Sequence, residues 1–229
     1  MLTLLWISGI LLVILPQFWV RGTLNKYANE PASIGKTGAE VAKEILNRYG
    51  LNNVSVETTP MGDHYDPQTK AVRLTPNFYN GTSLSAVTVA AHECGHAIQD
   101  AENYGFMRLR AAVMPVIQIC QFGPMLLVFS LMLTAFIASP IWKLTAVIGL
   151  FMYIGIFFFQ MITLPVELDA SFARAVPILE RSGYISPDEK ESAKKILQAC
   201  AFTYIAAALF SLIEIIRWAL ILFGNRNRN

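Results

Sequence analysis

Long apolar stretches without charge alternate with polar segments along this chain. Residues 2–20 contain no charged side chain at all. Two further apolar blocks, at about 113–138 and 144–164, are each long enough to cross about 30 Å of hydrocarbon as a helix. The short stretch 139–143 between them predicts a tight helical hairpin, and its Trp-Lys pair suits a membrane interface.

The first and the fourth apolar blocks carry an additional signal each. The first predicts a retained anchor, because it lacks the basic start and the small-residue cleavage site of a signal peptide. A cleaved signal remains the alternative, since the block is short and begins the sequence. The fourth, at about 201–223, is interrupted by Glu214 and Arg217. These lie three apart on one helical face, which predicts pairing with each other or with another helix and favours a structural role.

Composition places the chain among membrane proteins. It has 229 residues, 54% of them hydrophobic and 15% charged, with a mean hydropathy of +0.45. This is too apolar for one soluble domain. The net charge of +2 suits a lipid bilayer with anionic headgroups, and it favours no nucleic-acid partner. The three cysteines show no spacing of a disulfide framework or a thiolate metal site, which indicates a reducing compartment.

Lys and Arg residues predict the orientation in the membrane. Residues 21–112 carry nine of them and residues 165–200 carry five. With four spans these two segments share one side, so the positive-inside rule predicts a bacterial multi-pass cell-membrane protein with both in the cytoplasm. The basic tail at 225–229 argues mildly against this, unless the last helix lies partly in the interface. The predicted segments are a transmembrane anchor (1–20), a cytoplasmic segment (21–112), a transmembrane hairpin (113–164), cytoplasmic helices (165–200), and a last transmembrane helix with its tail (201–229).

The first polar segment predicts a small α+β region. Thr37 and Glu40 have the spacing of a capping box, which opens a helix. Residues 54–57 and 71–74 alternate with the period of a strand, and residues 66–69 supply turn chemistry between them. An edge strand of such a sheet could hold an extended peptide by main-chain pairing.

Two of the chain's three histidines occur in one short motif, His-Glu-Cys-Gly-His, on a helix predicted from about 84 to 104. His92 and His96 are four apart, so both imidazoles lie on one helical face and can reach a single ion. With the Glu93 carboxylate beside them to activate water, they form the arrangement of zinc-dependent hydrolases. Gly95 weakens a helix by about 1 kcal/mol relative to Ala, which predicts a close backbone contact there. Two solvated histidines on a surface helix are the alternative.

A catalytic zinc needs a third protein ligand and one open position. His64, near the predicted turn, is one candidate. Glu167 is favoured, because Pro165 marks the first turn of a helix that leaves the third apolar block. On that helix Glu167 shares a polar stripe with Ser171 and Arg174. A solvated acid at the membrane boundary is the alternative for Glu167.

These motifs resemble the bacterial YugP-like family of membrane neutral zinc metallopeptidases, which are distantly similar to the HtpX membrane proteases. The resemblance rests on residues 63–67, 90–99 and 165–171 and covers the whole chain. It implies peptidase chemistry, zinc and an integral membrane location. The chain departs from HtpX-like enzymes at Ser171, where they carry an acid, so a supporting carboxylate role does not carry over to position 171. Asp169 is not expected to replace it, because it points elsewhere on an α-helix.

The sequence as a whole predicts a mainly α-helical integral membrane protein with about four transmembrane helices. Its catalytic part is expected to be zincin-like and α+β, with the motif helix, a small β-hairpin and a Glu-bearing helix. The expected activity is that of a gluzincin-like zinc metalloendopeptidase with one Zn²⁺. The predicted site residues are the metal ligands His92, His96 and Glu167, the general base Glu93, and His64 as a catalytic candidate. His64, Tyr65 and Arg174 are the candidates for stabilising the oxyanion.

Polypeptides, including membrane proteins, are the expected substrates. One alternative is a membrane scaffold or chaperone-like protein with a structural or inactive metal site. Against it, a structural zinc site more often closes with a fourth Cys or His, and here Glu93 is intact beside both histidines. Another alternative, a transporter with a polar path near Glu214 and Arg217, explains neither the histidine motif nor the predicted sheet.

Overall fold

The computed structural model describes residues 2–136 and 141–224, and the chain divides into two compact units. The first, here called the helical unit, contains the described residues of Met1–Leu15, Leu109–Thr163 and Tyr204–Asn229. The second, called the mixed unit, contains Pro16–Arg108 and Leu164–Thr203. The basic tail at 225–229 and residues 139–140 of the turn predicted at 139–143 lie outside the described residues, whereas residues 141–143 are helical.

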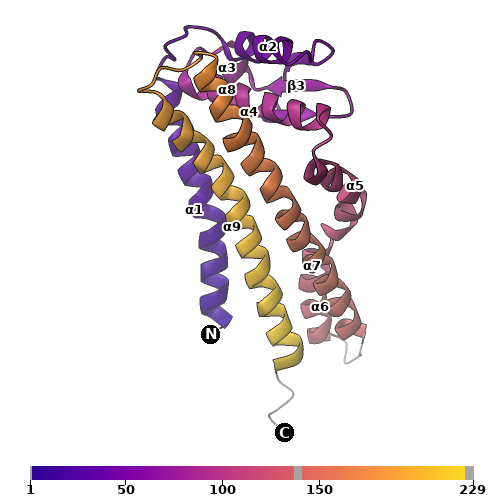
Figure 1. Ribbon diagram of the computed structural model, residues 1–229. Coiled ribbons are helices and arrows are strands. Elements are labelled where there is room, and N and C mark those ends of the chain that lie inside the picture. Colours follow the sequence, from indigo (N-terminus) through magenta and orange to yellow (C-terminus); the bar gives the residue numbers. More distant parts are fainter. Residues whose placement is uncertain (1, 137–140, 225–229) are drawn as a thin grey trace. The chain divides into compact units, whose positions relative to one another are not determined.

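Long apolar helices build the helical unit (Figure 1). They are α1 (Leu2–Ala28), α5 (Gly105–Cys120), α6 (Gly123–Phe136), α7 (Ile141–Leu168) and α9 (Lys190–Phe223). The described residues contain four helical stretches that are long and apolar enough to cross a membrane, as the sequence predicts. They are Trp6–Ala28, Gly105–Met132, Ile141–Arg181 and Lys190–Phe223. The second begins earlier than the apolar pattern indicates, and a turn at Gln121 and Phe122 separates α5 from α6.

Small residues let two of these helices approach closely. A Cβ added to Gly149 of α7 would lie 2.9 Å from the backbone oxygen of Gly123 on α6, and the reverse distance is 3.0 Å. Such glycine contacts are typical of helices that pack in a membrane. On α9, Glu214 accepts hydrogen bonds from Arg217, which confirms that these charges can pair with each other.

The mixed unit combines short helices with a small sheet. Its helices are α2 (Gly38–Arg48), α3 (Pro76–Asn80), α4 (Leu84–Ala101), the π-helix η1 (Asp169–Ala175) and α8 (Val176–Arg181). Its strands are β1 (Ser55–Thr58), β2 (His64–Asp66) and β3 (Ala71–Leu74). The ends of α1, α5, α7 and α9 complete it.

The predicted capping box is confirmed at the start of α2. The Glu40 backbone N–H donates to the Thr37 hydroxyl, and the Thr37 N–H donates to the Glu40 carboxylate over 2.8 Å. The apolar face that follows packs on α4, and Val41 and Ile45 are fully buried there. α2 therefore supports the back of the helix that carries the histidine motif.

The sheet differs from the expected pairing. β1 and β3, the two strands predicted from alternation, run parallel to each other and are not joined as a hairpin. The antiparallel partner of β3 is β2, so the strand order is β1-β3-β2. The turn chemistry predicted at 66–69 thus connects β2 to β3. The sequence pattern missed β2 because three residues are too short to show a period.

Pro165 does not start a helix, so that prediction is wrong. It lies inside α7, which runs without interruption to Leu168 and passes directly into η1. Membrane helices tolerate an internal proline because neighbouring groups bond the freed backbone. The residues from Asp169 to Ala175 wind as a π-helix, whereas the sequence was expected to continue with α-helical spacing.

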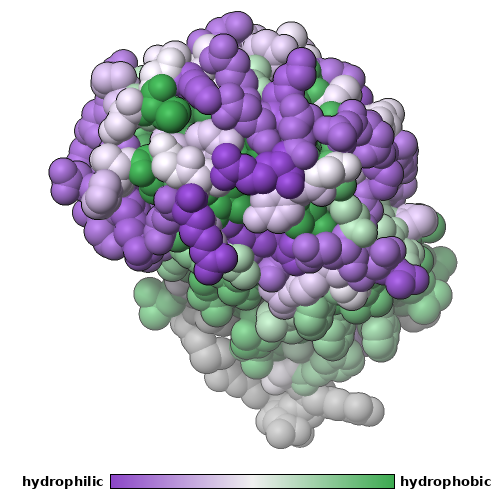
Figure 2. Space-filling view, turned by 45° about the horizontal axis from the view of Figure 1, so that its top comes forward, coloured by the Kyte–Doolittle hydropathy of each residue, from purple (hydrophilic) through white to green (hydrophobic). Residues whose placement is uncertain are grey.

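The exterior of the mixed unit is largely hydrophilic on the face seen in Figure 2. The exterior of the mixed unit also carries ion pairs, such as Lys36 with Glu44 at 2.5 Å and Lys190 with Glu180 at 2.9 Å. In contrast, the helical unit exposes large apolar side chains, including Phe122 and Phe151. These surfaces suit water and lipid, respectively.

The contact at Gly95 predicts a loss of stability in Gly95→Ala. The added Cβ would lie 2.8 Å from the backbone oxygen of Ala170 and 3.3 Å from its Cα. We expect the overpacking to outweigh the gain in helix propensity and lower the free energy of unfolding by about 1–3 kcal/mol. The matched control is Gly22→Ala in α1, where nothing lies within 4 Å of the added carbon. Denaturant unfolding in detergent measures both; equal stability of the two variants would contradict the packing argument.

The turn between β2 and β3 predicts an acid-dependent effect of Asp66→Asn. Asp66 accepts hydrogen bonds from Arg73 at 2.7 Å and from Thr69 at 2.8 Å, and these partners lower its pKa. A depressed carboxyl pKa stabilises the fold above the ordinary value of about 4, and the effect fades as pH falls towards the folded-state value. Asp66→Asn should therefore destabilise the protein at pH 7 and converge with wild type in acid. Unfolding curves across this range measure the difference, and a gap independent of pH would exclude the ion pair as its cause.

Candidate metal site

Helix α4 presents the two motif histidines on one face. The Ser83 hydroxyl accepts from the Ala86 N–H and caps the helix start, two turns before the motif. The rings of His92 and His96 stack edge to face, with centroids 4.7 Å apart. Cys94, between them, points away to the α2 side, where its thiol lies 3.5 Å from the Ala42 carbonyl oxygen.

The end of α7 brings Glu167 to both imidazoles. Its Oε2 lies 3.4 Å from Nε2 of His92 and 3.4 Å from Nε2 of His96. One ligand atom from each of the three residues lies within 4.8 Å of the others. Glu167 is only 2% exposed and His96 only 8%. A carboxylate and two ring nitrogens therefore face one small, buried space.

These distances fit a shared ion better than direct hydrogen bonds. Two atoms held about 2.05 Å from a tetrahedral ion lie about 3.3 Å from each other. Direct N–H···O hydrogen bonds cluster nearer 2.9 Å. Two imidazole nitrogens and one carboxylate oxygen are also the donor set that zinc accepts in catalytic sites. The residues present thus fit a zinc ion, and no further Cys, His, Asp or Glu of the described chain joins this group.

The close approach of α4 and η1 explains how a distant segment reaches the motif. Gly95 sits against the backbone of Ala170, where a side chain would not fit. This confirms the backbone contact predicted for Gly95. Since Ala170 follows Glu167 by three residues, the contact brings the carboxylate to the level of the histidines.

The other nitrogen of each ring also has a partner, which comes from η1 for His92 and from α4 itself for His96. The Ser171 hydroxyl lies 3.1 Å from His92 Nδ1. The Gln99 side-chain oxygen lies 2.9 Å from His96 Nδ1. The Gln99 amide nitrogen also donates to the Asp169 carboxylate over 2.8 Å, so Asp169 faces the motif helix, contrary to expectation. A π-helix has a wider turn than an α-helix, which changes the directions that the α-helical spacing predicts.

Glu93 is buried next to this group. It is 6% exposed, and burial raises its pKa above the ordinary range. The two histidines oppose this rise, whereas the negative charges of Glu167 and Asp63 add to it. Asp63 itself is fixed by the Thr75 backbone N–H, which donates to it over 2.6 Å.

Two of the three candidates for oxyanion stabilisation, Tyr65 and Arg174, have other partners. The Tyr65 hydroxyl donates to Asp100 over 2.7 Å. Arg174 donates to Asp169 over 2.6 Å and to Glu102 over 2.8 Å. Both side chains are therefore engaged in the structure.

His64 lies on β2, outside the group of possible metal ligands. Its Nδ1 is 2.8 Å from the Gly62 carbonyl oxygen, which can only accept a hydrogen bond. Nδ1 is then the protonated nitrogen of a neutral ring. Nε2 could donate to a substrate only from the imidazolium form.

Sequence reasoning missed Gln99 as a site residue. Its spacing of three from His96 places both on one helical face, so a signal was present. A glutamine at that spacing is common on buried helices, however, and only the distance to His96 Nδ1 gives it meaning. For Ser171 the sequence predicts only that a supporting carboxylate role does not carry over, yet a hydroxyl can also accept a hydrogen bond from an imidazole.

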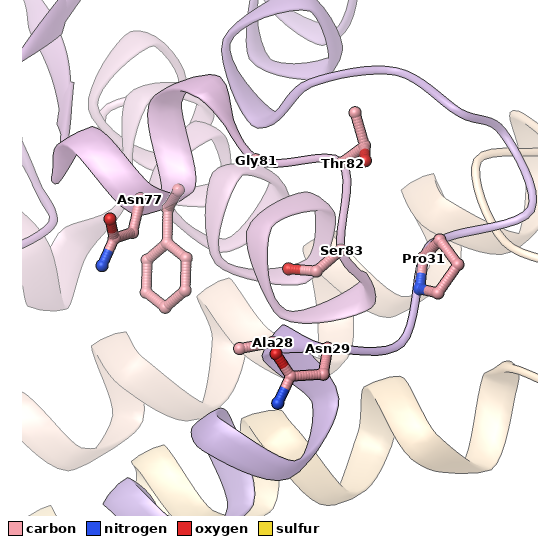
Figure 3. A pocket seen from close by; sticks show the side chains of 8 residues that line it. Ala28, Asn29, Pro31, Asn77, Gly81, Thr82 and Ser83 are labelled. Atoms are coloured by element: carbon pink, nitrogen blue, oxygen red, sulfur yellow. The ribbon is translucent and has the colours of Figure 1, made fainter.

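A pocket elsewhere in the mixed unit is separate from this group (Figure 3). Its volume is about 590 Å³, and it lies where α1 ends and α4 begins. Its walls are Ala28, Asn29, Pro31, Asn77, Phe78, Gly81, Thr82 and Ser83. These walls hold no titratable side chain, and most of them are exposed, so the pocket offers no acid-base or metal chemistry.

Comparison with known proteins agrees with the geometry. The sequence profile of the family described as "Putative neutral zinc metallopeptidase" matches residues 2–223. The chain is 40% identical over 216 residues to the "Putative membrane protease YugP" of Bacillus subtilis (strain 168). That alignment covers 93% of this chain and 92% of the relative. No solved structure matches the chain.

Proposed function

This chain belongs to the family described as "Putative neutral zinc metallopeptidase", and from that premise we propose that it is a membrane-embedded zinc endopeptidase. The observation that carries the proposal is the pair of 3.4 Å distances from one Glu167 oxygen to Nε2 of His92 and of His96. Four apolar helical stretches and the name of the relative support the membrane location.

His92, His96 and Glu167 would hold the ion, each through one atom. This set leaves a fourth position for water or substrate. When bound, zinc supplies Lewis-acid activation of a water molecule and of the scissile carbonyl. The three ligands fix the place of that chemistry inside the mixed unit.

Glu93 is the general base of the proposal. Its carboxylate takes a proton from the attacking water as the new C–O bond forms, and it later delivers this proton to the leaving amine as the peptide C–N bond breaks. Burial suits this role because it makes the carboxylate a better proton acceptor than an exposed one. His64 is the remaining candidate for stabilising the oxyanion, in its imidazolium form.

Polypeptides are the substrates of the proposed enzyme, with membrane proteins among them. β1 and β2 are the edge strands of the small sheet, and such an edge pairs with an extended chain by backbone hydrogen bonds. The excess of Lys and Arg in the two polar segments supports a site on the cytoplasmic side.

Glu93→Gln tests the chemistry. The amide cannot take a proton, so cleavage of a casein-like substrate should fall by about 10²- to 10⁴-fold. Zinc content should stay at the wild-type level, because Glu93 is not a ligand in the proposal. Metal analysis and a protease assay on the same purified samples measure both. Wild-type protein that binds zinc without cleaving any peptide would favour the scaffold alternative, and an active Glu93→Gln variant would exclude Glu93 as the base.

Glu167→Ala tests the ligand set. Loss of one of three ligands should weaken zinc binding by more than the 10–100-fold typical of changing a ligand's hydrogen-bond partner. Glu191→Ala, on the exposed start of α9, is the matched control and should bind zinc like wild type. Competition with a chelator measures the affinities. Stoichiometric zinc of unchanged affinity in Glu167→Ala would move the third ligand elsewhere.

A further inference from the structure

The Gln99 side chain is held in one orientation by two acceptors. Its amide nitrogen lies 2.8 Å from the Val166 carbonyl oxygen and 2.8 Å from Asp169 Oδ2. Neither a carbonyl nor a carboxylate can donate a hydrogen bond. If the amide were turned over, its oxygen would face both acceptors at these distances. The nitrogen must therefore point to Val166 and Asp169.

Asp169 is itself fixed in its role as an acceptor. The same Oδ2 receives the Arg174 Nε–H over 2.6 Å. Arg174 also donates to Glu102 over 2.8 Å, and its guanidinium has no acceptor to offer in return. The direction of donation is thus set along the whole row from Arg174 through Asp169 to Gln99.

This direction determines which His96 nitrogen carries the proton. With its nitrogen turned to Asp169, Gln99 presents its oxygen to His96 Nδ1 at 2.9 Å. An amide oxygen can only accept, so Nδ1 must be the protonated nitrogen. In the neutral ring Nε2 then carries the lone pair, and Nε2 is the atom that faces Glu167.

The partner of His92 gives no such constraint. A serine hydroxyl can donate or accept, so Ser171 tolerates either tautomer of the ring 3.1 Å away. The two histidines of the motif therefore differ in one respect: hydrogen bonding fixes the tautomer of His96 but leaves that of His92 open. Gln99 is also completely buried, which removes water as a competing partner for its amide.

From this row of contacts we propose that Gln99 is a positioning residue that locks His96 in its Nδ1–H tautomer and so presents Nε2 to the metal. The inference rests on the proposed zinc site, but it concerns the protein before the ion binds. Val166 and Asp169 belong to the segment that carries Glu167, so one amide both orients His96 and joins it to the third ligand's helix.

The chain's three histidines make a direct test practicable. Full-length protein with ¹⁵N-labelled histidine, freed of metal by a chelator in detergent micelles, gives three imidazoles whose long-range ¹H–¹⁵N spectra report the tautomers. Wild type should show His96 as the single Nδ1–H form. Gln99→Met, which keeps the length but removes the hydrogen bonds, should show both forms. Its zinc affinity should fall by about 10–100-fold.

Gln99→Glu separates positioning from a purely structural role. The carboxylate still accepts from His96, so the single Nδ1–H form should persist. The fold should become less stable, because a carboxylate cannot donate hydrogen bonds to Val166 and Asp169. Thr88→Val is the control for a buried change on α4, because the Thr88 hydroxyl has no hydrogen-bond partner in the described part of the chain. It should keep the wild-type tautomer and zinc affinity.

Two results would overturn the inference: an Nε2–H ring at His96 in wild type, or an unchanged tautomer in Gln99→Met. Failure of the proposed function looks different. In that case wild type would take up no zinc, while the spectra of the metal-free protein would still show whether Gln99 locks the ring.

Discussion

Burial of two carboxylates beside two imidazoles is the constraint around which the mixed unit is built. Glu167 and Glu93 are both buried. The negative charge of Glu167 contributes to the raised pKa of Glu93. Removing an ionised carboxylate from water is costly unless an opposite charge compensates it. The imidazoles of His92 and His96 face Glu167 with ring nitrogens that can bind a metal ion. A divalent cation between them would supply the compensation.

The backbone around this group brings the carboxylate of Glu167 close to the two histidines. A glycine in the motif helix gives η1 room to approach, and the π-helical turn redirects the side chains that follow Glu167. Asp169 and Arg174 are five residues apart and contact each other, a spacing that suits the wider turn. A regular α-helix would direct these side chains differently. The irregular segment is therefore part of how the site is assembled.

The sequence predicted those features that depend on local spacing or on length. The spacing of His92 and His96, the capping box at Thr37 and the four apolar stretches all follow from chemistry within a few residues or one helix. The parallel pairing of β1 with β3 did not, because pairing is decided by contacts between segments. The sequence pattern did not predict the π-helix for a similar reason. A widened turn is stabilised by packing against a neighbouring segment and leaves no period of its own in the sequence.

The order of the segments adds a last constraint on how the site forms. His92, His96 and Gln99 belong to the first stretch of the mixed unit, whereas Glu167 and its followers belong to the second. Apolar helices separate the two stretches, and Glu167 lies on the same continuous helix as one candidate span. A fragment limited to the first stretch would lack the carboxylate and both acceptors that orient Gln99. The candidate site is therefore a property of the whole chain, and its assembly requires that the intervening helices return the second stretch to the first.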